Sequence, residues 1–228
     1  MVEIVEEQHN RFKDAPWFPQ PDETVFIGGA GGIGSWLSLF LVRAGFHPYL
    51  YDFDTIEKHN LGGQLFRQRD IGSFKTEAMH NIISEFCGVN INALNVAVTK
   101  DSPVHHFCFS AFDNMEARQI LFDKWQESIP GCPVTPIFID GRLEMEQLQI
   151  FCVTPDKIEQ YKEHLFSDAS VPDAPCTLKQ TSHTAAHIAA MMTEFFTNHI
   201  TNIYQREVMR HVPFFYEFFT PVTLTTLD

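Results

Sequence analysis

The chain has 228 residues, enough to bury a sizeable core, and its apolar share of 44 % and charged share of 20 % are ordinary for a globular protein. Its formal net charge of −13 argues against general affinity for nucleic acid or for an anionic membrane. No apolar run approaches the roughly 20 residues of a membrane span, and the first residues do not have the pattern of a signal peptide. The five cysteines include no C-x-x-C pair, so we expect a cytoplasmic protein with no zinc site and no disulfide framework.

Strand-like and helix-like segments alternate along most of the chain. Residues 1–23 are polar and interrupted by prolines, which predicts an N-terminal arm. Beyond the arm, apolar or alternating runs predict strands, and helical periodicity predicts the helices between them. Strands are expected at 24–29, 47–54, 91–98, 105–112, 134–140 and 144–153, and helices at 34–45, 75–88, 114–128 and 181–200.

This alternation predicts an α/β fold with a doubly wound, mostly parallel sheet, because helices of this length imply right-handed crossovers. The alternating pattern of residues 144–153 indicates an antiparallel strand, and the aromatic-rich tail from residue 212 should add further strands. Residues 154–175 contain three prolines and several charges, which is typical of an exposed crossing loop. We expect residues 1–228 to form one domain.

The segment FIGGAGGIGS (26–35) follows the first predicted strand and carries glycines where backbone amides and a helix start would face an anion. Its candidate phosphate-binding residues are Gly29, Gly31, Gly32 and Gly34. About 20 residues further on, Asp52 ends the second strand, where a carboxylate can bind ribose hydroxyls. We include Asp54, in the same acidic strand end, among the nucleotide-binding candidates. These features fit NAD and ATP equally well.

Asp113 favours ATP, because it ends the fourth predicted strand across the crevice from the glycine loop. A carboxylate there would repel phosphates unless a cation lay between them, and Mg²⁺ commonly bridges one or two carboxylates to phosphate. Arg67, Arg69 and Lys75 add the positive charge that a departing pyrophosphate needs and a hydride donor does not. Taken singly, the glycines could serve packing, Asp113 could cap a helix and Lys75 could be a solvated charge. Together they predict a Mg-ATP site with Asp113 as the metal ligand.

The ordered motifs FIGGAGGIGS, YDFDTIEKHNLGGQLF, SAFDNMEAR and FIDG resemble the ThiF/MoeB and ubiquitin-activating enzyme superfamily, from about residue 24 to 141 and again around 176–195. Members of that superfamily adenylate the C-terminal glycine of a ubiquitin-fold protein, and many pass it on as a thioester or to sulfur. The resemblance therefore implies a Rossmann-like adenylation fold that uses ATP and Mg²⁺. It also implies a ubiquitin-like or sulfur-carrier partner, a conjugating enzyme as one acceptor, and a homodimer.

The same resemblance places Asn60, Gln64 and Lys75 around the triphosphate and makes Asp113 the magnesium aspartate. The family usually reads N-L-x-R-Q where this chain reads NLGGQ, so Gly63 replaces an arginine that contacts phosphate. Either Arg67 or Arg69 compensates for that loss, or the chain is slow or inactive.

Arg11 matches an arginine of the family's N-terminal arm that reaches the partner subunit's ATP. The second arginine of that pattern falls on Asp14, so a plain surface arginine is the alternative interpretation.

Cys176, in APCTLKQT (174–181), stands where the predicted crossing loop meets a helix, and a helix dipole favours the thiolate. PCTLK resembles the catalytic cysteine motif of eukaryotic ubiquitin-activating enzymes, which implies thioester capture of the activated carrier. A helix-start cysteine without a chemical role is the alternative.

The sequence thus predicts ATP-dependent adenylation of the C-terminal carboxylate of a carrier protein, followed by transfer to Cys176. Three alternatives stay open: a non-catalytic partner-binding subunit, an enzyme that adenylates a peptide in natural-product maturation, and, more remotely, an NAD(P) oxidoreductase.

Overall fold

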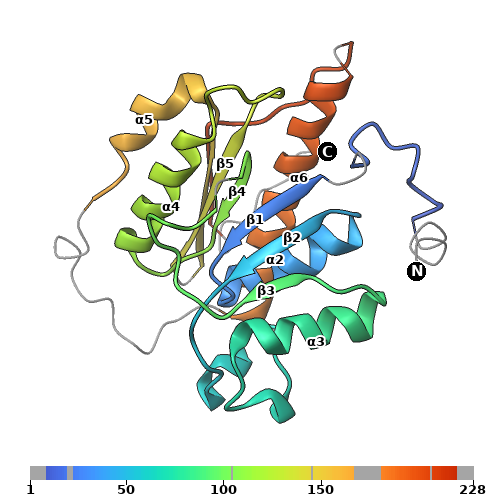
Figure 1. Ribbon diagram of the computed structural model, residues 1–228, viewed down its shortest axis with the longest axis vertical. Helices are drawn as coiled ribbons and strands as arrows, with labels where there is room; N and C mark the ends of the chain where they lie inside the picture. The colour runs from blue at the N-terminus through green and yellow to red at the C-terminus, as the bar shows by residue number, and fades with distance from the viewer. Residues whose placement is uncertain are drawn as a thin grey trace, which may run out of the picture.

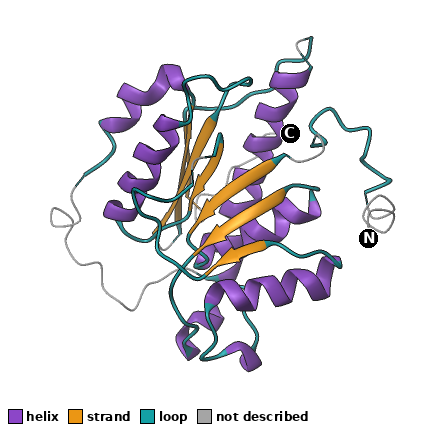
Figure 2. Ribbon diagram, viewed as in Figure 1, coloured by secondary structure: helices purple, strands orange, loops and turns teal. Residues whose placement is uncertain are grey.

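The computed structural model describes residues 9–19, 23–103, 105–144, 146–166, 181–205 and 207–219. In this part of the chain a seven-stranded sheet crosses the middle of the molecule, with helices on both faces (Figures 1 and 2). The strands are β1 (Thr24–Gly28), β2 (His47–Tyr51), β3 (Asn92–Leu94), β4 (Phe107–Ser110), β5 (Ile137–Glu144), β6 (Gln147–Val153) and β7 (Phe215–Phe219). The helices are α2 (Gly32–Arg43), α3 (Lys75–Cys87), α4 (Met115–Glu127), α5 (Ile158–Lys162) and α6 (Ser182–Tyr204), with short 3₁₀ turns η1 (Lys58–Gly62), η2 (Gln68–Asp70) and η3 (Pro155–Lys157).

The sheet has the order β3-β2-β1-β4-β5-β6-β7. Strands β1 to β5 run parallel, whereas β6 pairs antiparallel with both β5 and β7. This confirms the predicted mostly parallel sheet with antiparallel strands toward the C-terminus. The chain leaves β1 in one direction through β2 and β3 and returns on its other side as β4. The topological switch point therefore lies between β1 and β4, and a crevice at their carboxyl ends is where such sheets bind ligands.

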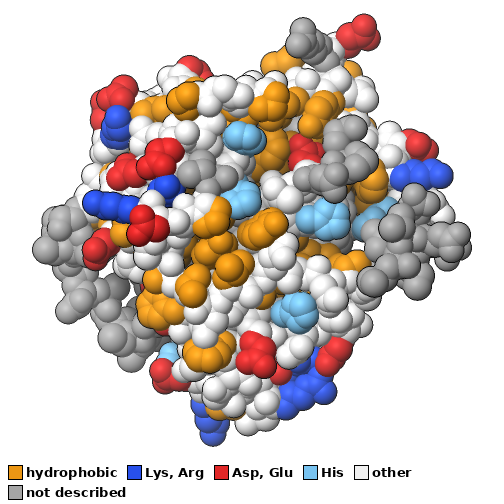
Figure 3. Space-filling view, viewed as in Figure 1, with side chains coloured by type: hydrophobic (Ala, Val, Ile, Leu, Met, Phe, Trp, Pro, Cys, Tyr) orange, Lys and Arg blue, Asp and Glu red, His pale blue; other side chains and the backbone are white. Residues whose placement is uncertain are grey.

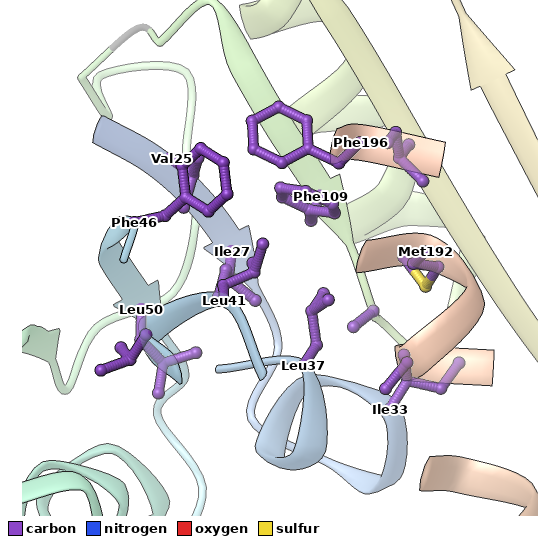
Figure 4. Packing of buried hydrophobic residues seen from close by; sticks show 14 of the residues in the cluster. Val25, Ile27, Ile33, Leu37, Leu41, Phe46, Leu50, Phe109, Met192 and Phe196 are labelled. Carbon is purple, nitrogen blue, oxygen red and sulfur yellow. The ribbon is translucent and has the colours of Figure 1, made fainter. Parts of the chain in front are cut away.

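Alternate side chains of the central strand β1 enter two separate cores. Val25 and Ile27 face α2 and α6, where Leu37, Leu41 and Phe196 pack against them (Figure 4). Phe26 points to the other face, which is covered by α4 and α5. A strand buried on both faces reads as a continuous apolar run, which is why TVFIG predicts this position.

The region after β6 differs from the sequence prediction, which treats residues 154–175 as an exposed loop. Residues 155–157 form η3 and residues 158–162 form α5. Tyr161 is fully buried in the second core, and its hydroxyl donates to Asp140 at 2.9 Å. One buried aromatic side chain thus fixes a segment whose prolines and charges suggest a loop. Residues 167–175, at the end of the predicted loop, lie outside the described part of the chain, as do residues 1–8, 20–22 and 220–228.

No helix in the described ranges is long and apolar enough to cross a membrane. On the face shown in Figure 3, Lys and Arg side chains are scattered among acidic ones and form no single basic patch.

Candidate functional site

The glycine turn between β1 and α2 lies at the carboxyl end of β1, beside the switch point, and three of its glycines have different roles. Gly29 has φ of +94°, and a Cβ there would lie 2.8 Å from the carbonyl oxygen of Ala111, at the end of β4. A Cβ on Gly34 would overlap the carbonyl oxygen of Gly29, so this glycine lets the helix pack on the turn. A Cβ on Gly31, by contrast, would meet no atom within 4 Å. The pattern suits a loop that turns tightly, leaves one open approach to its backbone and packs closely against its helix.

The amino end of α2 borders that open approach. Gly31 caps the helix without a side chain, and the first turn contains no acidic residue. Its first backbone N–H groups have no partner within the helix, so the helix start can accept an anion. Gly32 is part of this first turn and is buried.

Asp52 follows β2 and is hydrogen-bonded to the glycine turn. Its Oδ2 accepts from the N–H of Ala30 at 2.7 Å, and its Oδ1 accepts from the N–H of Asp54 at 2.8 Å. Burial raises the pKa of Asp52, while the Lys75 ammonium and the two N–H groups partly offset that effect. Each carboxylate oxygen keeps a lone pair free, so Asp52 can still accept from hydroxyl groups of a ligand.

Residues 53–74, called here the 53–74 segment, leave the sheet between β2 and α3 and return. A bridge between Thr55 and Phe74 closes the base of the segment. On the other side, the N–H of Leu65 donates to Ser35 Oγ at 3.0 Å, and Trp36 Nε1 donates to the carbonyl oxygen of Gly63 at 3.3 Å. The segment is therefore held against α2, beside the glycine turn.

Two residues of the 53–74 segment that the family resemblance places near the triphosphate show different contacts. The side-chain oxygen of Asn60 accepts from the N–H of Glu57 at 2.8 Å and closes η1. The Oε1 atom of Gln64 is buried and has no hydrogen-bond partner. Buried polar atoms are nearly always paired, so an orphaned amide oxygen here is consistent with a missing ligand or water.

Lys75 begins α3, and its Nζ lies 2.6 Å from Asp54 Oδ2. The lysine side chain is 9 % exposed, which separates it from an ordinary solvated surface lysine. This pair sits beside Asp52, at the carboxyl end of β2.

Arg67 and Arg69, the candidates to replace the arginine absent at position 63, are engaged in ion pairs. Arg67 Nε lies 2.9 Å from Asp70 Oδ2, and its Nη1 pairs with Glu85. Arg69 Nη2 lies 2.7 Å from Glu85 Oε1. In this arrangement both guanidinium groups bind protein carboxylates.

Asp113 lies in the turn between β4 and α4 and is exposed. Its Oδ1 accepts from Asn114 Nδ2 at 3.3 Å, while Asn114 Oδ1 caps α4 through the N–H of Ala117 at 2.8 Å. Asn114, and not Asp113, therefore caps the helix. This leaves the Asp113 carboxylate with oxygen lone pairs for a cation.

Behind this turn lies a buried cluster of charges that sequence reasoning missed. Asp140, at 0 % exposure, accepts from Arg118 Nε at 2.6 Å, from Arg142 Nε at 2.8 Å and from the Tyr161 hydroxyl. Burial alone would raise the pKa of Asp140, but the two guanidinium groups outweigh it and hold the pKa below the ordinary value. An acid that ends the apolar run PIFID was the available signal, since strand residues of this kind are seldom charged.

Two predicted site residues are not brought into the crevice by described contacts. Cys176 lies outside the described residues. Arg11 is exposed in the turns of residues 9–17. Of the described cysteines, Cys87, Cys108 and Cys152 are buried, and burial raises the pKa of each thiol, which disfavours a nucleophilic thiolate.

The described residues include no group of three or more His, Cys, Asp and Glu side chains able to hold a metal ion. Magnesium bound through one carboxylate and phosphate oxygens needs no such group.

Comparison with known proteins agrees with this geometry. The sequence profile of the ThiF family matches residues 22–218, which is most of the chain. The chain belongs to the ThiF family. A stretch of 94 residues is 33 % identical to ubiquitin-like modifier-activating enzyme 5 of Dictyostelium discoideum, and 70 residues are 37 % identical to the protein of that name in Oryza sativa subsp. japonica. The matches cover 41 % and 30 % of this chain but only 22 % and 16 % of those relatives.

Solved structures share the fold over a longer stretch. PaaA superposes with a TM-score of 0.67 at 17 % identity, covering 96 % of this chain and 80 % of PaaA. E. coli tRNA N6-threonylcarbamoyladenosine dehydratase, TcdA, in complex with ATP gives 0.65 at 16 % identity, covering 88 % of this chain and 94 % of TcdA. E. coli MccB with ATP gives 0.60 at 16 % identity, covering 88 % of this chain and 59 % of MccB. At these identities the likeness shows a common ThiF/MoeB-type fold.

Proposed function

We propose that this chain binds Mg-ATP in the crevice between β1 and β4 and adenylates the C-terminal carboxylate of a ubiquitin-like or sulfur-carrier protein. The main support is the convergence of three features at the switch point. They are an open glycine turn after β1, Asp52 after β2 with the Asp54–Lys75 pair beside it, and the exposed carboxylate of Asp113 in the turn after β4. The strands β2, β1 and β4 are neighbours in the parallel part of the sheet. The partial relatives are named for activation of ubiquitin-like modifiers, and structural neighbours were solved with ATP or AMP.

The residues of the crevice fit ATP. The open side of Gly31 and the start of α2 would receive phosphate oxygens, and Asp52 would accept from the ribose hydroxyls. The amide side chain of Gln64, with its orphaned oxygen, and the Lys75 ammonium would lie along the triphosphate. Asn60, Asp54, Gly29, Gly32 and Gly34 would shape this binding surface.

Asp113 would hold Mg²⁺, whose charge would lower the repulsion among the phosphates. Arg67 and Arg69 would stabilise pyrophosphate only after exchanging their carboxylate partners for phosphate. The exposed pair of Arg69 with Glu85 is weak, so this exchange costs little for Arg69, whereas Arg67 would also have to leave the buried carboxylate of Asp70.

In the proposed reaction, a carboxylate oxygen of the carrier attacks the α-phosphorus of ATP. The bond from that phosphorus to the bridging oxygen of the β-phosphate breaks, and pyrophosphate leaves with the electron pair. The thiolate of Cys176 would then attack the acyl carbon, and AMP would leave. A homodimer in which Arg11 reaches the other subunit's crevice, and transfer from Cys176 to a conjugating enzyme, complete the proposal.

Pyrophosphate exchange tests the adenylation step. Labelled pyrophosphate should enter ATP only when the cognate carrier is present, and Asp113→Asn should abolish this exchange without loss of fold. Asp101→Asn, another exposed aspartate outside the crevice, is the matched control and should retain the wild-type rate. Equal exchange in the Asp113→Asn and Asp101→Asn variants would remove Asp113 from the site. A peptide substrate would instead support exchange with the peptide alone.

The thioester step and the assembly need separate measurements. Cys176→Ala should keep pyrophosphate exchange but lose a carrier adduct that reducing agents cleave, whereas Cys132→Ala should keep the adduct. A carrier adduct that survives in Cys176→Ala would reject this assignment. Sedimentation at micromolar concentration should give a dimer, and an active monomer would contradict the proposed role of Arg11.

A further inference from the structure

The turn that carries Asp113 is held in place by an arginine that does not reach the solvent. Arg118, on the first turns of α4, is 4 % exposed. Its Nη2 donates to the carbonyl oxygen of Phe112 at 2.7 Å, one residue before Asp113. We propose that Arg118 is a positioning residue, which orients the Asp113 carboxylate by fixing the peptide that precedes it. The link to metal binding rests on the function proposed above.

The guanidinium of Arg118 is itself held by contacts with two residues of β5. Its Nε donates to Asp140 Oδ1 at 2.6 Å, and Nη2 also lies 3.5 Å from the carbonyl oxygen of Gly141. Arg118 therefore ties the turn after β4 to the residues of β5 that lie next to it. A planar guanidinium can donate in these several directions at once, which a lysine ammonium cannot reproduce with the same geometry.

The turn is restrained on its other side by packing. The ring of Phe112 lies so close to Gly28, at the end of β1, that a Cβ on Gly28 would overlap it. The N–H of Ala111 donates to the carbonyl oxygen of Gly28 at 2.8 Å. Phe112 is therefore restrained by two contacts: its ring packs against Gly28, and its carbonyl oxygen accepts a hydrogen bond from Arg118.

The Asp113 side chain has no comparable restraint of its own. It is exposed, and the contact shown by its carboxylate is the long hydrogen bond from its neighbour Asn114. Its direction therefore depends on the backbone of the turn, and loss of the Arg118 bond should loosen that backbone before it affects the core.

Arg142 supplies a matched control, because it shares Asp140 through the other carboxylate oxygen. Its other contacts are with the carbonyl oxygen of His164 and the rings of Phe151, Tyr161 and Phe166, away from the Asp113 turn. Arg118→Lys and Arg142→Lys each keep a positive charge near Asp140, but only the first removes the bond to Phe112.

Hydrogen exchange of the unliganded protein tests the positioning itself. In Arg118→Lys, the Ala111 amide, which donates to Gly28, should exchange about tenfold faster than in the wild type, as expected for loss of one charge-assisted hydrogen bond. Arg142→Lys should leave this amide at the wild-type rate. Unchanged exchange at Ala111 in Arg118→Lys, or equal acceleration in both variants, would overturn the proposal whether or not the protein binds ATP.

Calorimetric titration of ATP at several Mg²⁺ concentrations tests the consequence for the metal. Arg118→Lys should need about tenfold more Mg²⁺ for half-maximal ATP binding, whereas Arg142→Lys should match the wild type. A wild-type protein that binds no ATP would reject the proposed function, and with it the metal role of Arg118. A wild type that binds Mg-ATP beside an Arg118→Lys variant with unchanged Mg²⁺ dependence would reject the metal role alone.

Discussion

One carboxylate shared between two arginines occurs at two places in the described chain, in opposite surroundings. On the β4–β5 side, Asp140 is fully buried between Arg118 and Arg142. On the side of the 53–74 segment, Glu85 is 54 % exposed between Arg67 and Arg69. Water and salt screen the second group, whereas the first has no solvent to replace a lost partner.

The difference between these two groups matches two tasks of the proposed phosphate-transfer site. The Asp140 group can hold a turn in one orientation, because breaking it leaves buried charges unpaired. The Glu85 group can release Arg69 to another anion at little cost, which suits a residue expected to meet a transient pyrophosphate, while Arg67 stays bound to Asp70 as well. The same ion-pair chemistry is thus rigid in one place and exchangeable in the other because the solvent exposure differs.

The largest expected effect comes from removing the buried carboxylate. Asp140→Asn should lower the free energy of unfolding by about 3–5 kcal/mol, because both guanidinium groups then lack a counter-charge in the interior. Chemical denaturation followed by circular dichroism measures this loss. A loss below about 1 kcal/mol would mean that the Asp140 group is no more restrictive than the Glu85 group.

Acidification should remove the difference in unfolding free energy between the wild type and the Asp140→Asn variant. Since its pKa is lower in the folded than in the unfolded protein, Asp140 stabilises the fold fully above the unfolded value of about 3.9, and this contribution is lost as the pH falls through the folded value. The stability difference between wild type and Asp140→Asn should therefore be constant above about pH 5 and shrink below about pH 4. A difference that grows on acidification would contradict the direction of the pKa shift.

A smaller loss of stability is expected from substitutions in the glycine turn between β1 and α2. Gly34→Ala should destabilise the protein by about 1–3 kcal/mol, because the new methyl group would overlap the carbonyl oxygen of Gly29. Gly31→Ala is the matched control and should change stability by less than about 0.5 kcal/mol, since that position is open. Thermal unfolding of the two variants makes the comparison, and equal losses would mean that the turn is not packed as described.

The smallest loss of stability is expected from removing the exposed carboxylate of Glu85. Glu85→Gln should cost less than about 1 kcal/mol of stability, and added salt should reduce even this difference. Urea denaturation at low and high salt provides the measurement. A salt-independent loss approaching that of Asp140→Asn would show that Arg67 and Arg69 are structural and not free to meet a phosphate.

The sequence predicted the parallel part of the fold well because its strands are buried on both faces. β1 and β4 read as apolar runs that end in a small residue, so both the strands and their carboxyl ends could be located. The switch point followed from their order. Asp52 directly follows β2 as predicted, whereas Asp113 lies in the turn three residues after the end of β4. The bounds of β3 were harder to predict, since only Asn92–Leu94 pair within the stretch 91–98 that the sequence predicts as a strand.

Long-range partners were beyond sequence reasoning. Nothing local in NMEAR shows that Arg118 turns inward to Asp140, 22 residues further on. The sequence analysis also treated Arg67 and Arg69 as cations available to phosphate. It missed their ion pairs with Glu85, because Glu85 belongs to the following helix. Charge pairing across elements is set by packing, which periodicity does not reveal.

ATP binding by Gly31→Val tests the central claim most directly. A Cβ at residue 31 would meet no protein atom within 4 Å, so the valine should occupy the approach to the phosphates in a variant that stays folded, which circular dichroism checks. Titration calorimetry with Mg-ATP should show binding to the wild type and none to Gly31→Val. Equal ATP affinity in the two proteins would contradict a phosphate site at the glycine turn between β1 and α2.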